Sequence, residues 1–229
     1  MTQPAVKRLS VALLSDVLAG KGISIPPGAA ERLLLHAEEM LRWNRSIRLT
    51  AITVPEEVVV KHILDSLLLL SFAPFPGRTL DFGSGAGYPG IPLAIALPEA
   101  SVVLLESSAK KCAFLSRACS MLGLSNACVV RGKLTPKTPL AIGRYEHIVT
   151  RATLPPLEAA GLLVPYLPPG GRLLLMTGPG GDRGMTMEGE GEKGGKVGLP
   201  PGAVYGRRER FALPLGMGAR EIREIKGRS

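Results

Sequence analysis

The stretch from Thr79 to Glu106, TLDFGSGAGYPGIPLAIALPEASVVLLE, decides the fold. Residues 79–82 are mostly apolar, as in a buried strand, and they run directly into a loop with glycine at every second position. Glycine tolerates positive φ angles and lets a ligand come close to the backbone. Pro89 and Pro92 mark the start of a helix, where a missing N–H group does no harm. Residues 101–105 predict the next buried strand, which Glu106 ends.

This order of strand, glycine loop, helix, strand and acid predicts a βαβ unit that binds a nucleoside. The free N–H groups at the start of its helix favour an anion or a carboxylate. Parallel strands would bring Glu106 to the same sheet edge as the glycine loop. A carboxylate at that place can accept hydrogen bonds from both hydroxyls of a ribose.

Two nucleoside cofactors compete for this unit. Gly85, Gly87 and Gly90 match the dinucleotide pattern G-x-G-x-x-G, but this match is weak in a chain with 28 glycines. Asp81, followed by glycine at every second position, resembles instead the S-adenosylmethionine (SAM) loop of Rossmann-like methyltransferases. In that loop the acid and the backbone amides hold the methionine part. We therefore expect SAM, with an NAD-dependent oxidoreductase as the alternative.

Composition limits the class of protein. The 229 residues include 28 Lys and Arg against 19 Asp and Glu, which gives a net charge of +9 and favours polyanionic partners such as RNA. No apolar run reaches membrane-spanning length, and the N-terminus lacks the pattern of a signal peptide. The cysteines have no metal-binding spacing, so we expect no metal site, buried free thiols and a reducing, cytoplasmic location; they are Cys112, Cys119 and Cys128.

Hydrophobic spacing divides the chain into a helical extension, residues 1–76, and a SAM-binding domain, residues 77–229. The extension is expected to hold three helices, the third running from about Pro55 to Ser71. The domain alternates strands and helices, which predicts an α/β fold with a parallel sheet covered by helices on both faces. Residues 203–225 suggest two short antiparallel strands at the end, and residues 178–202 predict a flexible glycine-rich loop.

Several segments together resemble the glucose-inhibited division protein B (RsmG) family. They are Trp43-Asn44, Leu49-Thr50-Ala51-Ile52, His62-Ile63-Leu64-Asp65-Ser66, the loop from Asp81 to Pro92, and Thr150-Arg151-Ala152. The resemblance covers nearly the whole chain. It implies a bacterial SAM-dependent methyltransferase that modifies N7 of a guanine in the 530 loop of 16S ribosomal RNA. The implied partner is this RNA or the small ribosomal subunit, and the protein is expected to act as a monomer without a membrane.

The SAM loop and the family resemblance imply a set of cofactor contacts: Asp81, Gly83, Gly85, Gly87, Tyr88, Glu106, Leu134, Thr135 and Arg151. Arg151 would also position the methyl donor and the guanine. Guanine N7 carries a lone pair and no proton, so positioning can suffice without a general base. Candidate RNA contacts are Arg48, His62 and Lys133.

Some positions depart from the family pattern or stay outside it. Arg48 stands where the family usually has Asn, Lys133 where it has Arg, and Thr177 where it has Lys. The alternative function is therefore a SAM-binding, RNA-associated protein with an altered substrate or lost turnover. His36 and His147 carry no motif and are expected to have no functional role. A C-terminal set of cations could extend an RNA surface: Arg207, Arg208, Arg210, Arg220, Arg223, Lys226 and Arg228.

Overall fold

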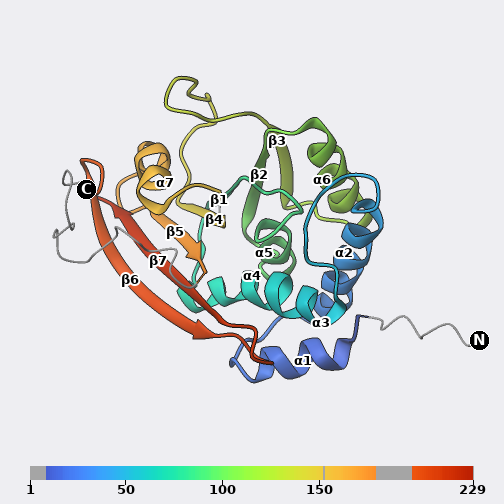
Figure 1. Ribbon diagram of the computed structural model, residues 1–229. Helices are drawn as coiled ribbons and strands as arrows, with labels where there is room; N and C mark the ends of the chain where they lie inside the picture. The colour runs from blue at the N-terminus through green and yellow to red at the C-terminus, as the bar shows by residue number, and fades with distance from the viewer. Residues whose placement is uncertain (1–8, 152, 179–197, 229) are drawn as a thin grey trace, which may run out of the picture.

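The computed structural model describes residues 9–151, 153–178 and 198–228 (Figure 1). Its centre is a seven-stranded sheet in the order β3-β2-β1-β4-β5-β7-β6. The strands are β1 Arg78–Phe82, β2 Ser101–Glu106, β3 Ala127–Arg131, β4 His147–Arg151, β5 Arg172–Thr177, β6 Ala203–Ala212 and β7 Ala219–Gly227. The first five are parallel, and β7 pairs antiparallel with both β5 and β6. The α/β sheet and its antiparallel end are confirmed, but β6 and β7 are longer than the two short strands expected. Most of the loop predicted at residues 178–202 lies outside the described residues.

The strand order reverses between β1 and β4. From β1 the chain builds outward through β2 to β3, and it then returns to place β4 on the other side of β1. Phe82 at the end of β1 is in register with Leu105 of β2 and with Thr150 of β4. In open α/β sheets, ligands bind at the carboxyl ends of strands at such a switch point.

The helices occur close to the predicted places. They are α1 Val11–Ala19, α2 Ala29–Trp43, α5 Gly90–Ala96, α6 Ala109–Met121 and α7 Pro156–Leu163, followed by a 3-10 turn at Val164–Tyr166. Ser10 caps α1 by accepting a hydrogen bond from the amide of Leu13 at 3.3 Å. In α2, Glu31 lies in the first turn and Arg42 in the last, where each complements the helix dipole.

The third predicted helix of the extension is present but irregular. It begins as α3 Pro55–Val58, continues as a π-helix at Val59–Leu64 and as α4 Asp65–Leu67, and ends in a 3-10 helix at Leu68–Phe72. Short π-helical segments often occur at functional sites. The π-helix carries His62, which lies in the cavity described below.

Helices cover both faces of the sheet, as predicted, but unequally (Figure 1). One face presents Leu104, Val149 and Leu174 to a core shared with α1, α2, α5, α6 and residues 55–72. The other face presents Leu80 and Leu105 mainly to α7. The helices of the extension thus share a core with the sheet, while the domain boundary at residue 76 stays a prediction.

Two expectations about side chains are wrong. Cys128 is exposed, because it lies on β3 at the edge of the sheet, whereas Cys112 and Cys119 are buried as expected. In the C-terminal cation set, Arg223 is buried against Glu221, and Arg220 pairs with the fully buried Asp65. These two arginines therefore form ion pairs within the fold. Within the described residues, no helix is both long and apolar enough to cross a membrane.

Candidate functional site

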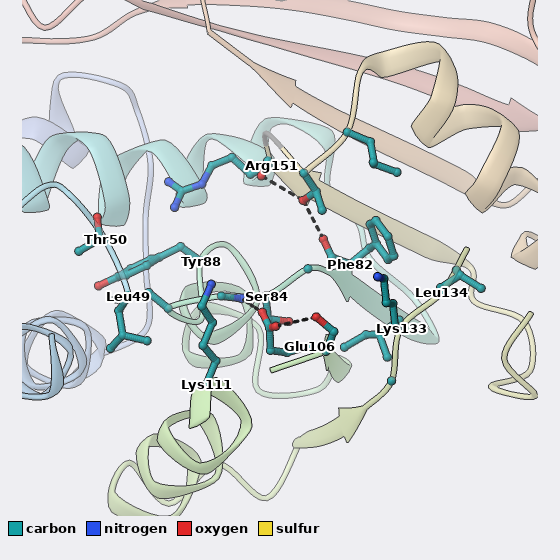
Figure 2. A pocket seen from close by; sticks show the side chains of 18 of the residues that line it. Leu49, Thr50, Phe82, Ser84, Tyr88, Glu106, Lys111, Lys133, Leu134 and Arg151 are labelled. Carbon is teal, nitrogen blue, oxygen red and sulfur yellow. Dashed lines mark hydrogen bonds between the residues drawn. The ribbon is translucent and has the colours of Figure 1, made fainter. Parts of the chain in front are cut away.

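A cavity of about 610 Å³ opens at the carboxyl ends of β1, β2, β3 and β4 (Figure 2). Nine predicted site residues line it: His62, Gly83, Gly85, Tyr88, Glu106, Lys133, Leu134, Thr135 and Arg151. Leu49, Thr50 and His62 reach it from the helical extension. The sheet edge and the extension thus build one site. Asp81, Gly87 and Arg48 do not line this cavity.

The glycine loop is fixed against the end of β2. The amides of Gly83 and Ser84 both donate to the carbonyl oxygen of Leu105, at 2.9 and 3.1 Å. Gly83 has φ +76°, and a Cβ there would come within 2.7 Å of the Thr153 side chain. Gly85 has φ +56°, and a Cβ there would meet only the Gly83 carbonyl oxygen, at 3.7 Å. The loop therefore needs glycine for its backbone and offers main-chain groups to the cavity.

Glu106 is buried at the cavity wall with its carboxylate held by main-chain donors. Oε2 accepts from the amide of Gly85 at 3.0 Å, and Oε1 accepts from the amide of Ser108 at 2.8 Å. Oγ of Ser107 also donates to Oε1 at 3.3 Å, and because an ionised carboxylate has about four acceptor positions, capacity for a ribose hydroxyl remains. The sequence-based placement at the edge of the glycine loop is confirmed, while the ribose contact itself stays a prediction.

Asp81 lies behind the loop. Its Oδ2 accepts from the amide of Gly90, the first residue of α5, at 3.0 Å. Its Oδ1 is buried and has no hydrogen-bond partner among the described residues. Burial raises the pKa of Asp81 to about 7, although the hydrogen bond from Gly90 opposes that shift. Asp81 thus anchors the start of α5, and its contact with a cofactor stays a prediction, as does that of Gly87.

Tyr88 lies between two histidine rings. The ring of His62 stacks on it with centroids 4.7 Å apart and planes 13° apart, and the ring of His36 lies at 4.7 Å with a 39° tilt. Nε2 of His36 donates to the carbonyl oxygen of Ala86 at 3.0 Å. Burial lowers the pKa of His36 to about 4, so it is neutral. His36 thus has a structural role that the sequence did not suggest: it ties α2 to the glycine loop, across 50 residues of sequence.

Arg151, at the end of β4, reaches over the ring of Tyr88 toward Thr50 (Figure 2). Its Nη1 donates to the carbonyl oxygen of Lys61 at 2.9 Å and to Oδ2 of Asp65 at 3.1 Å. Its Nη2 lies 3.2 Å from Nδ1 of His62. The guanidinium is therefore held by the irregular helix of the extension. The sequence placed His62 and Asp65 on one helical turn, but it could not show that both contact Arg151.

Two lysines bring positive charge to the cavity. Lys133 follows β3, and Lys111 lies in the first turn of α6; Figure 2 shows both side chains extending toward the space between the strand ends. Neither has a carboxylate partner within 4 Å among the described residues. The sequence did not single out Lys111 as a site residue, because a lysine near a helix start is usually solvated. Arg48 is exposed, next to the cavity residue Leu49.

The donor set suits an organic cofactor with hydroxyl, amino and carboxylate groups. The cavity combines loop main chain, one buried carboxylate and apolar walls from Phe82, Leu105 and Leu134. Within the residues that the structure describes, no group of three or more His, Cys, Asp or Glu side chains could hold a metal ion. His62 is neutral, because burial and then the nearby Arg151 charge lower its pKa to about 3.

Sequence comparisons with known proteins identify relatives of this chain. A family model described as rRNA small subunit methyltransferase G (GidB) matches residues 29–184. The chain is 38% identical over 218 residues to ribosomal RNA small subunit methyltransferase G of Anaeromyxobacter sp. (strain Fw109-5), covering 95% of this chain and 97% of the relative. It is 39% identical over 159 residues to the protein of that name from Myxococcus xanthus (strain DK1622), covering 69% and 73%.

A solved structure supports the fold independently. A putative O-methyltransferase from Klebsiella pneumoniae superimposes with a TM-score of 0.60 over 95% of this chain and 97% of that chain, at 16% sequence identity. At this identity the likeness concerns the fold alone. The matched family model and the relatives carry the assignment: the chain belongs to the rRNA small subunit methyltransferase G (GidB) family.

Proposed function

We propose that this protein transfers a methyl group from SAM to N7 of a guanine in the 530 loop of 16S ribosomal RNA. One observation carries the proposal: a single cavity joins the glycine loop and Glu106 on one side to Arg151 and the helical extension on the other. Membership of the rRNA small subunit methyltransferase G family supports methyl transfer as the reaction in this cavity. Family membership also favours SAM as the cofactor over NAD, the dinucleotide alternative.

The residues present fit SAM, which supplies an electrophilic methyl group on a sulfonium. Glu106 would accept the ribose hydroxyls, because its carboxylate is already oriented by Gly85 and Ser108. The main chain of Gly83 and Gly85 would bind the methionine part. Leu134 and Thr135, after β3, would flank the adenine.

The acceptor needs little acid–base chemistry. Guanine N7 carries a lone pair in the plane of the ring and no proton, so nothing has to be removed before attack. The neutral His62 is accordingly not required as a base. Arg151 retains an Nε–H that no described residue uses, and this donor can orient the base. Positioning alone can lower a barrier by several kcal/mol, up to roughly 7–11 in well-oriented systems.

Positive charge supports an RNA substrate. The net charge is +9, and Lys111 and Lys133 lie at the cavity. Contacts between cations and phosphates release counterions, so RNA affinity should fall steeply as salt rises. Affinity that is unchanged between low and high salt would contradict this part of the proposal. A ribosomal substrate agrees with the cytoplasmic location expected from the cysteines. We also propose that the active species is a monomer.

A methyl-transfer assay tests the proposed function. Labelled SAM and 16S RNA that lacks the modification should yield N7-methylguanine in the 530 loop, mapped by mass spectrometry. The assay is run with enzyme in excess over RNA, so that a single turnover suffices. SAM binding by calorimetry without any methylated RNA would favour the alternative, a SAM-binding protein with another substrate or lost turnover, for which the departures at Arg48, Lys133 and Thr177 are the candidate causes.

A further inference from the structure

His62 makes hydrogen bonds through both ring nitrogens to two different parts of the site. Nδ1 lies 3.2 Å from Nη2 of Arg151, and Nε2 lies 2.9 Å from Oγ1 of Thr50. Only 5% of His62 is exposed, and its ring is stacked on Tyr88. The imidazole therefore links the end of β4 to the loop that follows α2.

The contact with Arg151 implies one tautomer of this ring. Arginine has only N–H donors, so Nδ1 of His62 must accept from Arg151. The proton of the neutral imidazole then lies on Nε2, which donates to Oγ1 of Thr50. The same Oγ1 accepts from the amide of Ile52 at 3.0 Å. The hydrogen bond from Arg151 thus sets the direction of the others in this chain, whereas the carbonyl oxygen of Lys61, which also contacts the ring, would accept from the opposite tautomer.

Both ends of the link are fixed to rigid elements. Oδ1 of Asn44, at the end of α2, accepts from the amides of Leu49 and Thr50 at 2.8 and 3.0 Å. At the other end, the carboxylate of Asp65 is fully buried and bridges Arg151 and Arg220. The positions of Thr50 and Arg151 are therefore coupled through one imidazole.

We propose that His62 is a positioning residue that couples the loop around Thr50 to the placement of Arg151 in the methyl-transfer site. The inference rests on the proposed function. The loop carries the exposed Arg48, two residues before Thr50, so RNA that contacts this loop would act on the Arg151 guanidinium through His62. Arg151 would then be set for the acceptor base by the element that meets the RNA.

The tautomer can be measured without any turnover. The chain has three histidines, so ¹⁵N-histidine NMR gives few signals, and a His62→Asn variant assigns the one that matters. We expect His62 as the Nε2–H tautomer in the wild type and a loss of that single form in Thr50→Val and in Arg151→Lys. Thr53→Val, an exposed threonine in the same loop, should leave the spectrum unchanged. An Nδ1–H or a protonated His62 at neutral pH would overturn the assignment.

Kinetics then separate positioning from simple structural support. Thr50→Val removes both hydrogen bonds that Oγ1 accepts, from His62 and from the Ile52 amide, and should lower kcat by about 5- to 10-fold, while SAM affinity changes less than about twofold. Thr50→Ser, which keeps the hydroxyl, should recover most of the loss. In an Arg151→Lys background, Thr50→Val should have a smaller effect, because the link is already broken.

Two kinetic results would overturn the coupling: equal effects of Thr50→Val in both backgrounds, or a wild-type kcat in Thr50→Val. If the wild-type protein methylates no RNA at all, the proposed function fails instead. The NMR measurement still decides whether the His62 link exists.

Discussion

Gly90, the first residue of α5, is packed so closely that one added methyl group should destabilise the protein. A Cβ at this position would overlap Cδ2 of Leu104 and lie 2.6 Å from Oδ2 of Asp81. Both neighbours are buried, so neither can move into solvent. Overpacking of this kind costs about 1–3 kcal/mol, and the better helix propensity of alanine returns at most about 1 kcal/mol. We expect Gly90→Ala to lose about 2 kcal/mol.

Gly161 in α7 provides a matched control. It is also a helical glycine, but it is exposed and a Cβ there would meet nothing within 4 Å. Gly161→Ala should therefore gain about 0.5–1 kcal/mol. Urea denaturation at a constant m-value measures both changes, and Gly90→Ala should lower Tm by about 4–8 °C for a protein of this size.

The same substitution should also weaken SAM binding, because Asp81 and the amide of Gly90 hold the glycine loop to α5. Calorimetry with SAM measures this effect, with Gly161→Ala expected to bind as the wild type does. A Gly90→Ala protein as stable as the wild type would refute the packing argument.

Three further predictions concern the cofactor, the RNA and pH. Glu106→Gln should weaken SAM binding about tenfold or more by calorimetry, because a charged hydrogen-bond acceptor is lost; unchanged affinity would exclude the ribose contact. Lys133→Ala should weaken RNA binding and reduce the slope of log affinity against log salt by about 1; an unchanged slope would remove Lys133 from the phosphate contacts. All three histidines have lowered pKa values, about 4, 3 and 4, because burial disfavours their charged forms. The unfolded chain therefore binds more protons below pH 6.5, so stability should fall as pH drops from about 6.5 to 4. The raised pKa of Asp81 acts in the opposite direction and offsets part of this loss. Denaturation at stepwise pH tests the sign, and stability that rises on acidification would contradict it.

The sequence predicted the parts of the site that depend on local pattern and sheet topology. The glycine loop and Glu106 belong to one βαβ unit, and parallel strands must bring their carboxyl ends to one edge. For the same reason Arg151, at the end of a predicted strand, could be expected beside them. The structure places all of these around one cavity.

Contacts between distant elements could not be predicted in this way. His36 binds the carbonyl oxygen of Ala86 and Arg151 binds Asp65, yet neither pair shares a helix, a strand or a motif. Cys128 was expected to be buried because free thiols usually are, but the position of β3 at the sheet edge decides its exposure. Such features depend on how the helical extension and the sheet pack together.

Methyl transfer to RNA tests the central claim most directly. The protein is incubated with labelled SAM and with small ribosomal subunits, or their RNA, that lack the modification, and the product is mapped by mass spectrometry. Our account predicts N7-methylguanine in the 530 loop, at a rate that falls in Arg151→Lys. Tight SAM binding with no methylated guanine in either substrate, even at enzyme excess, would contradict it.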